Sequence, residues 1–337
     1  DLAITYLERA ISLDPDNAAA HFNLGSALQD KGDHKAAIKS YKNAIKIKPD
    51  YAEAYCNLGN AQRDRGDLDA AIKSFKKSLI LDPICATTHY NIGIYFQDNG
   101  NLEAAINSYE NALAINPNYS NAYNNLGTSL VEKGDLKLAI NYFKKANKIQ
   151  PDQAEIFLNL GVAQKNIGDL ASAINSYKEA IKIKPNYADA HYNLGNALDY
   201  NGDLDAAIIS FKRAIKIKPD FPDASYGLAL AYLAKGDFYN GWVEYDSRFK
   251  TEQASPILSN KKKITGSLNK KKRLLLREEQ GIGDQIMFLS AIPEIYKICS
   301  QLIIQTDERL IPLFKRSFPP DIIFYSITKN IYSKIIE

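Results

Sequence analysis

The sequence predicts an all-α solenoid of stacked helix pairs, followed by a partial α/β segment. The solenoid is predicted by a period of 34 residues that repeats through roughly the first 250 residues. The α/β segment is predicted by the region after residue 271, where short apolar runs alternate with helical patterns. A hydrophobic fraction of 45% beside 24% charged residues excludes a wholly disordered chain.

The period divides the chain into units. Residues 1–17 form the second half of a unit, residues 18–221 form six full units, and residues 222–250 form a degenerate capping unit. A polar linker is expected at residues 251–271 and an incomplete α/β domain at residues 272–337. Positions are counted from the first residue of each full unit, which is Ala18, Ala52, Ala86, Ser120, Ala154 or Ala188.

Two helices are predicted in every unit, because apolar residues recur at helical spacing in both halves. A Gly-Asp or Gly-Asn pair separates the halves. Its glycine ends the first helix in a left-handed conformation, and its Asp or Asn caps the second helix. The pairs begin at Gly32, Gly66, Gly100, Gly134, Gly168 and Gly202. Glycine at position 8 and alanine at position 20 let two helices approach closely, and an aromatic residue at position 24 fills the space beside them.

These spacings, with the stretch Ala122-Tyr123-Asn124-Asn125-Leu126-Gly127, resemble the tetratricopeptide repeat family. The resemblance covers about 250 residues, and six units agree in period and residue type. It implies a right-handed superhelix (an α-solenoid) in which the first helix of each unit lines a concave groove. It also implies a function in protein–protein interaction.

Position 6 is asparagine in every full unit, and the implied superhelix places it in the groove. The series is Asn23, Asn57, Asn91, Asn125, Asn159 and Asn193. An asparagine side chain offers an acceptor and two donor hydrogens, so it pairs with both groups of a peptide bond. The series predicts a ladder that holds an extended peptide by its backbone, and it resembles the asparagine ladder of the protein O-linked N-acetylglucosamine transferases. The alternative, compatible with the first, is that these asparagines stabilise the repeat fold.

Acidic residues at position 13 predict the charge of the partner. Four units carry a carboxylate there: Asp30, Asp64, Asp98 and Glu132. Such a stripe repels a terminal carboxylate, and the cations of the family's carboxylate-clamp repeats are absent from positions 2, 5 and 6. We therefore expect an extended polypeptide of neutral or basic character. The alternative is a solvated helix face without a ligand.

Neither a metal nor a cofactor is predicted for this chain. The histidines at position 4 replace a packing aromatic residue and are expected in the core rather than on a metal: His21, His89 and His191. Three widely spaced cysteines predict no disulfide framework, so a reducing, cytoplasmic setting is expected. The lack of a long apolar run and the net charge of +3 favour neither a membrane nor a nucleic-acid partner. Met287 is the single methionine, so the sequence is expected to be a fragment or a processed product.

The region after the linker has the order strand, helix, strand, helix, strand. The strands are expected at residues 274–276, 302–304 and 322–324, and the helices at residues 285–299 and 308–318. This order predicts the start of a parallel, Rossmann-like sheet with right-handed crossovers. The remaining length is too short for a complete doubly wound domain, so a truncated sheet is expected.

The stretches Gly241–Phe249 and Leu275–Asp284 resemble bacterial tetratricopeptide proteins fused to a GT-B glycosyltransferase domain, and the Gly-Asp loop resembles that of heptosyltransferases. The resemblance covers the N-terminal, acceptor-side half and implies Asp284 as the general base toward an acceptor hydroxyl. The alternative is that Asp284 caps the helix that begins at Gln285. Enzymes of this type hold the nucleotide-sugar mainly on the other half. The resemblance therefore implies that this chain is inactive by itself and that the nucleotide-sugar donor binds to the full-length parent.

Two functions are expected from these patterns. The first is a scaffold whose groove binds an extended polypeptide, as the targeting arm of a larger glycosyltransferase. The alternative is the acceptor-side portion of a GT-B glycosyltransferase that acts on a protein or saccharide hydroxyl. At the junction, Trp242, Tyr245 and Phe249 share a helical face that is expected to pack against the α/β segment.

Overall fold

The structure is a computed structural model that describes residues 2–245, 273–277, 292–306 and 308–326. It divides into two compact regions, the repeat region Asp1–Thr251 and the C-terminal region Glu252–Glu337. The expected linker at residues 251–271 lies outside the described residues.

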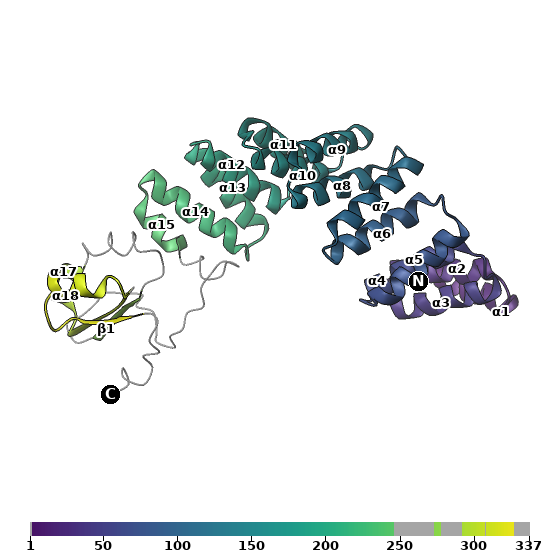
Figure 1. Ribbon diagram of the computed structural model, residues 1–337, viewed down its shortest axis with the longest axis horizontal. Coiled ribbons are helices and arrows are strands. Elements are labelled where there is room, and N and C mark those ends of the chain that lie inside the picture. Colours follow the sequence, from purple (N-terminus) through teal and green to yellow (C-terminus); the bar gives the residue numbers. More distant parts are fainter. Residues whose placement is uncertain (1, 246–272, 278–291, 307, 327–337) are drawn as a thin grey trace. The chain divides into compact units, whose positions relative to one another are not determined.

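The repeat region is built from antiparallel helix pairs (Figure 1). Its helices are α1 (Leu2–Leu13), α2 (Ala18–Asp30), α3 (His34–Ile47), α4 (Ala52–Asp64), α5 (Leu68–Leu81), α6 (Ala86–Asp98), α7 (Leu102–Ile115), α8 (Ser120–Lys133), α9 (Leu136–Ile149), α10 (Ala154–Asn166), α11 (Leu170–Ile183), α12 (Ala188–Tyr200), α13 (Leu204–Ile217), α14 (Pro222–Lys235) and α15 (Phe238–Tyr245). Every even-numbered helix from α2 to α14 packs against the odd-numbered helix that follows it. The predicted all-α solenoid is confirmed, and each full unit begins where its first helix begins.

The Gly-Asp turns have the predicted geometry. The glycines that end the first helices have φ between 72° and 93°, in the left-handed region that disfavours side chains. Five of the six residues after these glycines accept a hydrogen bond from the backbone two or three residues on: Asp33, Asp67, Asn101, Asp169 and Asp203. Asp135 departs from this pattern, because its side chain makes no capping bond.

A small residue and an aromatic ring interlock in the middle of each unit. The alanines at position 20 are fully buried, and the rings at position 24 are at most 1% exposed. A Cβ on Gly127 would lie 2.7 Å from Cε1 of Phe143, so glycine at position 8 is required for the ring to lie against α8. The predicted packing role of these three positions is therefore confirmed.

Consecutive first helices, such as α8 and α10, approach each other more closely than consecutive second helices do. The stack therefore curves with its even-numbered helices on the inner side. Position 6 lies in the middle of these inner helices, so the asparagine series follows the row of inner helices.

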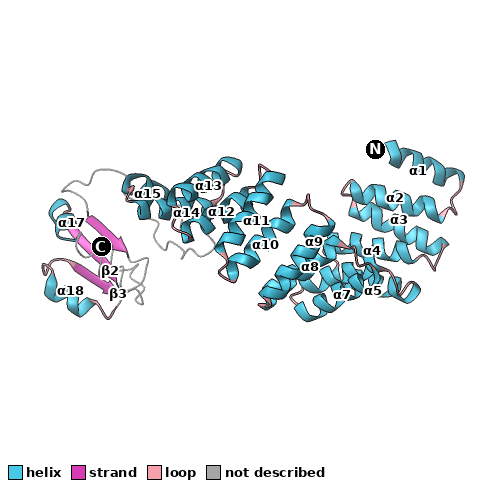
Figure 2. Cartoon of the chain, turned by 90° about the horizontal axis from the view of Figure 1, so that it is seen from above, coloured by secondary structure: helices cyan, strands magenta, loops and turns pink. Residues whose placement is uncertain are grey.

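The C-terminal region contains a parallel sheet of strands β1 (Arg273–Arg277), β2 (Gln301–Thr306) and β3 (Ile323–Ser326), in the order β1-β2-β3. Helix α17 (Ile292–Ile298) lies between β1 and β2 in the chain, and α18 (Ile311–Ser317) between β2 and β3 (Figure 2). Leu302, Ile304, Phe314 and Phe324 form its buried centre. The parallel pairing agrees with the expected element order, and assignment as a Rossmann-like domain remains a prediction.

The degenerate unit ends in α15. A Cβ on Gly241 would lie 2.6 Å from Cδ2 of Leu233, so the residue that takes the place of the packing alanine is held tightly against α14. The Tyr245 ring lies 5.7 Å from that of Tyr226. The side chains of Trp242 and Phe249 lie outside the described residues, so the packed junction remains a prediction.

Candidate peptide-binding surface

The inner surface carries a row of hydrogen bonds that connect neighbouring units. Asn91 Nδ2 donates to Cys56 Sγ (3.4 Å), Asn125 Nδ2 donates to the Tyr90 hydroxyl (3.2 Å), and Asn159 Nδ2 donates to Asn124 Oδ1 (3.0 Å). In all three bonds, position 6 of one unit reaches position 5 of the preceding unit, 35 residues earlier. The residue at position 5 therefore determines whether this bond can form.

Where position 5 lacks an acceptor, the asparagine bonds elsewhere. Position 5 before Asn193 is Leu158, and Asn193 Nδ2 instead donates to the carbonyl oxygen of Asp189 in its own helix (2.9 Å). Position 5 before Asn57 is Phe22, and Asn57 instead bonds to the Tyr41 hydroxyl on α3 of the preceding unit.

These partners separate the asparagine series into two groups. Asn91 is only 5% exposed, whereas Asn23 is exposed. Asn91, Asn125 and Asn159 connect units, as the stabilising interpretation expects. Asn57 also reaches the preceding unit, through Tyr41 of α3. Asn23 and Asn193 make no such connection and are the members with most freedom to bind a ligand. The ligand role of the series remains a prediction.

The acidic series at position 13 has two environments. Asp30, Asp98 and Glu132 are exposed near the carboxyl ends of α2, α6 and α8. Negative charge at this end of a helix is unfavourable to the helix itself, so helix stability does not explain these residues.

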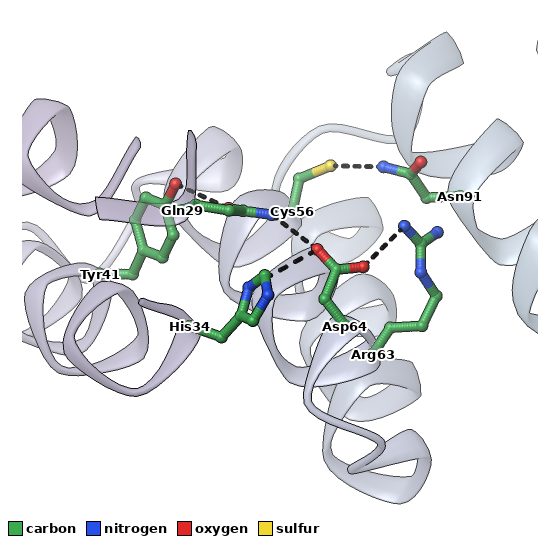
Figure 3. A network of polar contacts seen from close by, with 7 residues as sticks. All are labelled: Gln29, His34, Tyr41, Cys56, Arg63, Asp64 and Asn91. Carbon is green, nitrogen blue, oxygen red and sulfur yellow. Dashed lines mark hydrogen bonds and ion pairs between the residues drawn. The ribbon is translucent and has the colours of Figure 1, made fainter. Parts of the chain in front are cut away.

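Asp64 belongs to a polar network between the first two full units (Figure 3). The Tyr41 hydroxyl donates to Gln29 Oε1 (3.0 Å), and Gln29 Nε2 donates to Asp64 Oδ2 (3.1 Å). A guanidinium nitrogen of Arg63 lies 3.2 Å from Asp64 Oδ1. Figure 3 shows Gln29 between Tyr41 and Asp64, with His34 beside Asp64. Asp64 is therefore less available to a ligand than the other acidic residues of its series.

The histidines at position 4 connect each unit to the turn before it. His21, His89 and His191 place Nε2 3.0–3.1 Å from the carbonyl oxygens of prolines six residues earlier. Burial lowers the pKa of His191. In the part of the chain that the structure describes, no cluster of three or more His, Cys, Asp or Glu side chains forms a metal site.

Aromatic pairs cover the junctions between units. Position 5 of a unit packs in a tilted arrangement against the residue just before the next unit in Phe22–Tyr51 (5.0 Å between ring centroids), Tyr90–Tyr119 (4.8 Å) and Tyr192–Phe221 (5.1 Å). Burial, followed by the nearby Tyr90 hydroxyl, raises the pKa of Tyr119 to about 12. At this junction the aromatic pair is therefore partly shielded from water.

A pocket of about 510 Å³ opens beside the asparagine row. Helix α8 contributes Asn121, Asn124 and Asn125, the start of α10 contributes Glu155, and Gln153 precedes α10. Tyr90 of α6, with Lys184 and Tyr187 between α11 and α12, completes the lining together with Ala154. The amides of this pocket were not singled out from the sequence, apart from Asn125. The sequence feature that could have indicated the pocket is Asn124, the polar residue at position 5 of the fourth unit.

The residues implied in catalysis are not placed. Asp284 and the Gly281–Gly283 loop lie outside the described residues. Among the helices that the structure describes, none is long and apolar enough to cross a membrane.

Models of known families match the helical unit. A TPR repeat model matches residues 1–32, 25–63 and 165–199, and tetratricopeptide repeat models match residues 52–85, 84–152 and 188–221. The helix pairs of this chain are tetratricopeptide repeats (TPRs). The matched stretches end at residue 221, so they concern the TPR region and not the C-terminal region.

Solved structures share the TPR fold. PilF of Pseudomonas aeruginosa has a TM-score of 0.55 at 19% identity and covers 60% of this chain and 93% of its own. The Cut9–Hcn1 hetero-tetramer of the APC/C has a TM-score of 0.57 at 20% identity, over 73% of this chain and 49% of that chain. YrrB, a TPR protein with an unusual peptide-binding site, has a TM-score of 0.48 at 27% identity, over 56% and 96%.

A curated relative matches part of the chain. Protein FlbA of Caulobacter vibrioides is 36% identical over 97 residues, which is 26% of this chain. The matched stretch spans only 15% of the length of FlbA. The TPR fold that the family models identify is consistent with a protein-interaction scaffold.

Proposed function

We propose that the inner surface of the TPR region binds an extended polypeptide through its main chain. The observation that carries the proposal is the row of first-helix carboxamides, which continues into an amide-lined pocket. Each carboxamide offers a donor and an acceptor to peptide groups. A backbone-directed contact of this kind accepts many sequences, and it binds only segments that are not already folded.

The polypeptide is proposed to be neutral or basic. The exposed carboxylates of Asp30, Asp98 and Glu132 follow the same row of helices as the carboxamides. Their potential attracts a cationic segment and repels an acidic one, and this preference weakens as salt is added. A cytoplasmic location is part of the same proposal.

The test is isothermal calorimetry with unstructured peptides and a double variant, Asn23→Ala and Asn193→Ala. These side chains do not tie one unit to the next, so the variant should keep its helicity and lose most of its affinity. A matched control makes the same change on second helices, at Asn141 and Asn175. This control should bind as the native chain does. Equal affinities of the native chain and both variants would remove the carboxamides from the binding surface.

A link to a glycosyltransferase remains a separate hypothesis. It is supported by the resemblance of Gly241–Phe249 and Leu275–Asp284, with Asp284 as the proposed base and a nucleotide-sugar as the proposed donor of a longer parent protein. The purified chain is expected to turn over no labelled nucleotide-sugar, and detectable transfer would contradict that expectation.

A further inference from the structure

We propose that the pocket around Asn124 and Gln153 is a specificity pocket for one tyrosine side chain of the bound polypeptide. The proposal rests on the proposed function, because the tyrosine belongs to the peptide held on the inner surface. It adds a sequence preference at one point to a contact that is otherwise directed at the main chain.

The pocket lies at a place where an aromatic pair is missing and two amides stand instead. Position 5 and the residue just before the next unit are 29 residues apart, and in three units they are aromatic rings with centroids 4.8–5.1 Å apart. The other three units lack the pair: the second holds Cys56 and Cys85, and the fifth holds Leu158 and Tyr187. In the fourth unit the same two places hold Asn124 and Gln153, so only this unit has an amide at both. The pocket is lined by both residues, so it occupies the region that an aromatic pair fills elsewhere.

The walls of the pocket suit a planar group. Tyr90 and Tyr187 both line it, and they come from the units before and after the missing pair. Aromatic rings prefer offset or edge-to-face contact with a further ring. An aromatic side chain from the ligand would continue the series of rings that covers the unit junctions.

The amides of the pocket require a polar end on that ring. Asn124 is 8% exposed, and its Oδ1 accepts the bond from Asn159. Its Nδ2 is 3.5 Å from Asn125 Oδ1, a long contact that leaves donor capacity for a ligand. A phenylalanine would cover these amides without bonding to them, which is costly for buried polar groups. A tyrosine hydroxyl both donates and accepts.

The charges beside the pocket argue against an arginine there. The lining contains one carboxylate, Glu155, and one ammonium group, Lys184, so its net charge is zero. Lys184 Nζ lies 4.6 Å from the centre of the Tyr187 ring. A guanidinium on the same ring would meet this cation at close range. A neutral ring with a hydroxyl meets no such repulsion.

The test uses a fluorescent Ser/Asn/Gly peptide with one central tyrosine, and matched peptides with Phe, Arg or Ala at that place. The tyrosine peptide should bind roughly tenfold or more tightly than the alanine peptide, as expected for a desolvated aromatic anchor. It should bind about three- to tenfold more tightly than the phenylalanine peptide, the worth of one hydrogen bond.

Two variants close the pocket in different ways. The double variant Asn124→Tyr and Gln153→Tyr rebuilds the missing pair, and the new hydroxyl at position 5 can accept from Asn159 as Tyr90 accepts from Asn125. Asn121→Trp blocks the exposed rim and leaves the Asn159–Asn124 bond in place. Both variants should bind all four peptides with the affinity that the native chain shows for the alanine peptide. Thr87→Ala, at the same position of the third unit as Asn121, is the control and should keep the preference for tyrosine.

The outcomes separate the two proposals. If the native chain binds all four peptides equally, the main-chain contact stands and the tyrosine pocket is wrong. A preference for the arginine peptide, or a tyrosine preference that survives in both closed variants, also overturns the pocket proposal. If no peptide binds to the native chain, the proposed function itself fails.

Discussion

Replacing Asn159 and Asn193 separately by alanine should separate stability from binding. Both are asparagines at position 6, but only Asn159 bonds to the preceding unit. Asn159→Ala leaves Oδ1 of the buried Asn124 without its donor, which costs about 1–3 kcal/mol. Alanine is the better helix former by roughly 0.5 kcal/mol, so the net loss should be about 1–2 kcal/mol.

Asn193→Ala removes an exposed bond within one helix. That loss and the gain in helix propensity nearly cancel, so the change should stay within about 0.5 kcal/mol. Urea unfolding followed by circular dichroism gives both values if the slope of the transition is unchanged. Peptide affinity should fall in Asn193→Ala. The reasoning is refuted if the two variants lose the same stability, or if Asn159→Ala loses none.

Three further changes test the packing. Gly161→Ala would place a Cβ 2.5 Å from Cε1 of the fully buried Tyr177 ring, so urea unfolding should show a loss of about 1–3 kcal/mol; native stability would mean that the ring has room to move. The Tyr177 hydroxyl is buried and has no hydrogen-bond partner among the described residues, so Tyr177→Phe, the residue type of Phe143 at the same position, should raise stability by roughly 1 kcal/mol in the same assay. Burial lowers the pKa of His191, so the unfolded chain binds its proton more readily and stability should fall as the pH drops below about 6.5; His191→Phe, as in Phe157, should weaken that fall in unfolding curves measured on both sides of this pH.

The repeat architecture could be predicted from the sequence because each of its requirements is local. A left-handed glycine and a capping Asp act within a few residues of themselves, and their recurrence fixes the period. Asp135 shows the limit of such rules, since its side chain makes no capping bond although the turn before it, at Gly134, is normal.

The candidate surface was less predictable, because its contacts join residues about one unit apart. The identity of position 6 alone suggested six equivalent asparagines. Their equivalence is broken by position 5, where Tyr90 accepts a bond and Leu158 does not. The pocket depends on a pairing over 29 residues, which becomes visible only when the helices are stacked. The α/β segment could be predicted as far as its strand order, since apolar runs mark the buried strands β2 and β3.

The bond from position 6 to position 5 has a consequence for how such a chain can change in length. Because it always spans 35 residues, inserting or deleting one whole unit recreates the same donor and acceptor positions on both sides of the cut. The new junction keeps this hydrogen bond wherever the residue at position 5 is an acceptor, as at Cys56 or Tyr90. Duplication of units can therefore lengthen the inner surface, while an unusual unit such as the one containing Asn124 keeps its pocket and only changes its distance from the two ends.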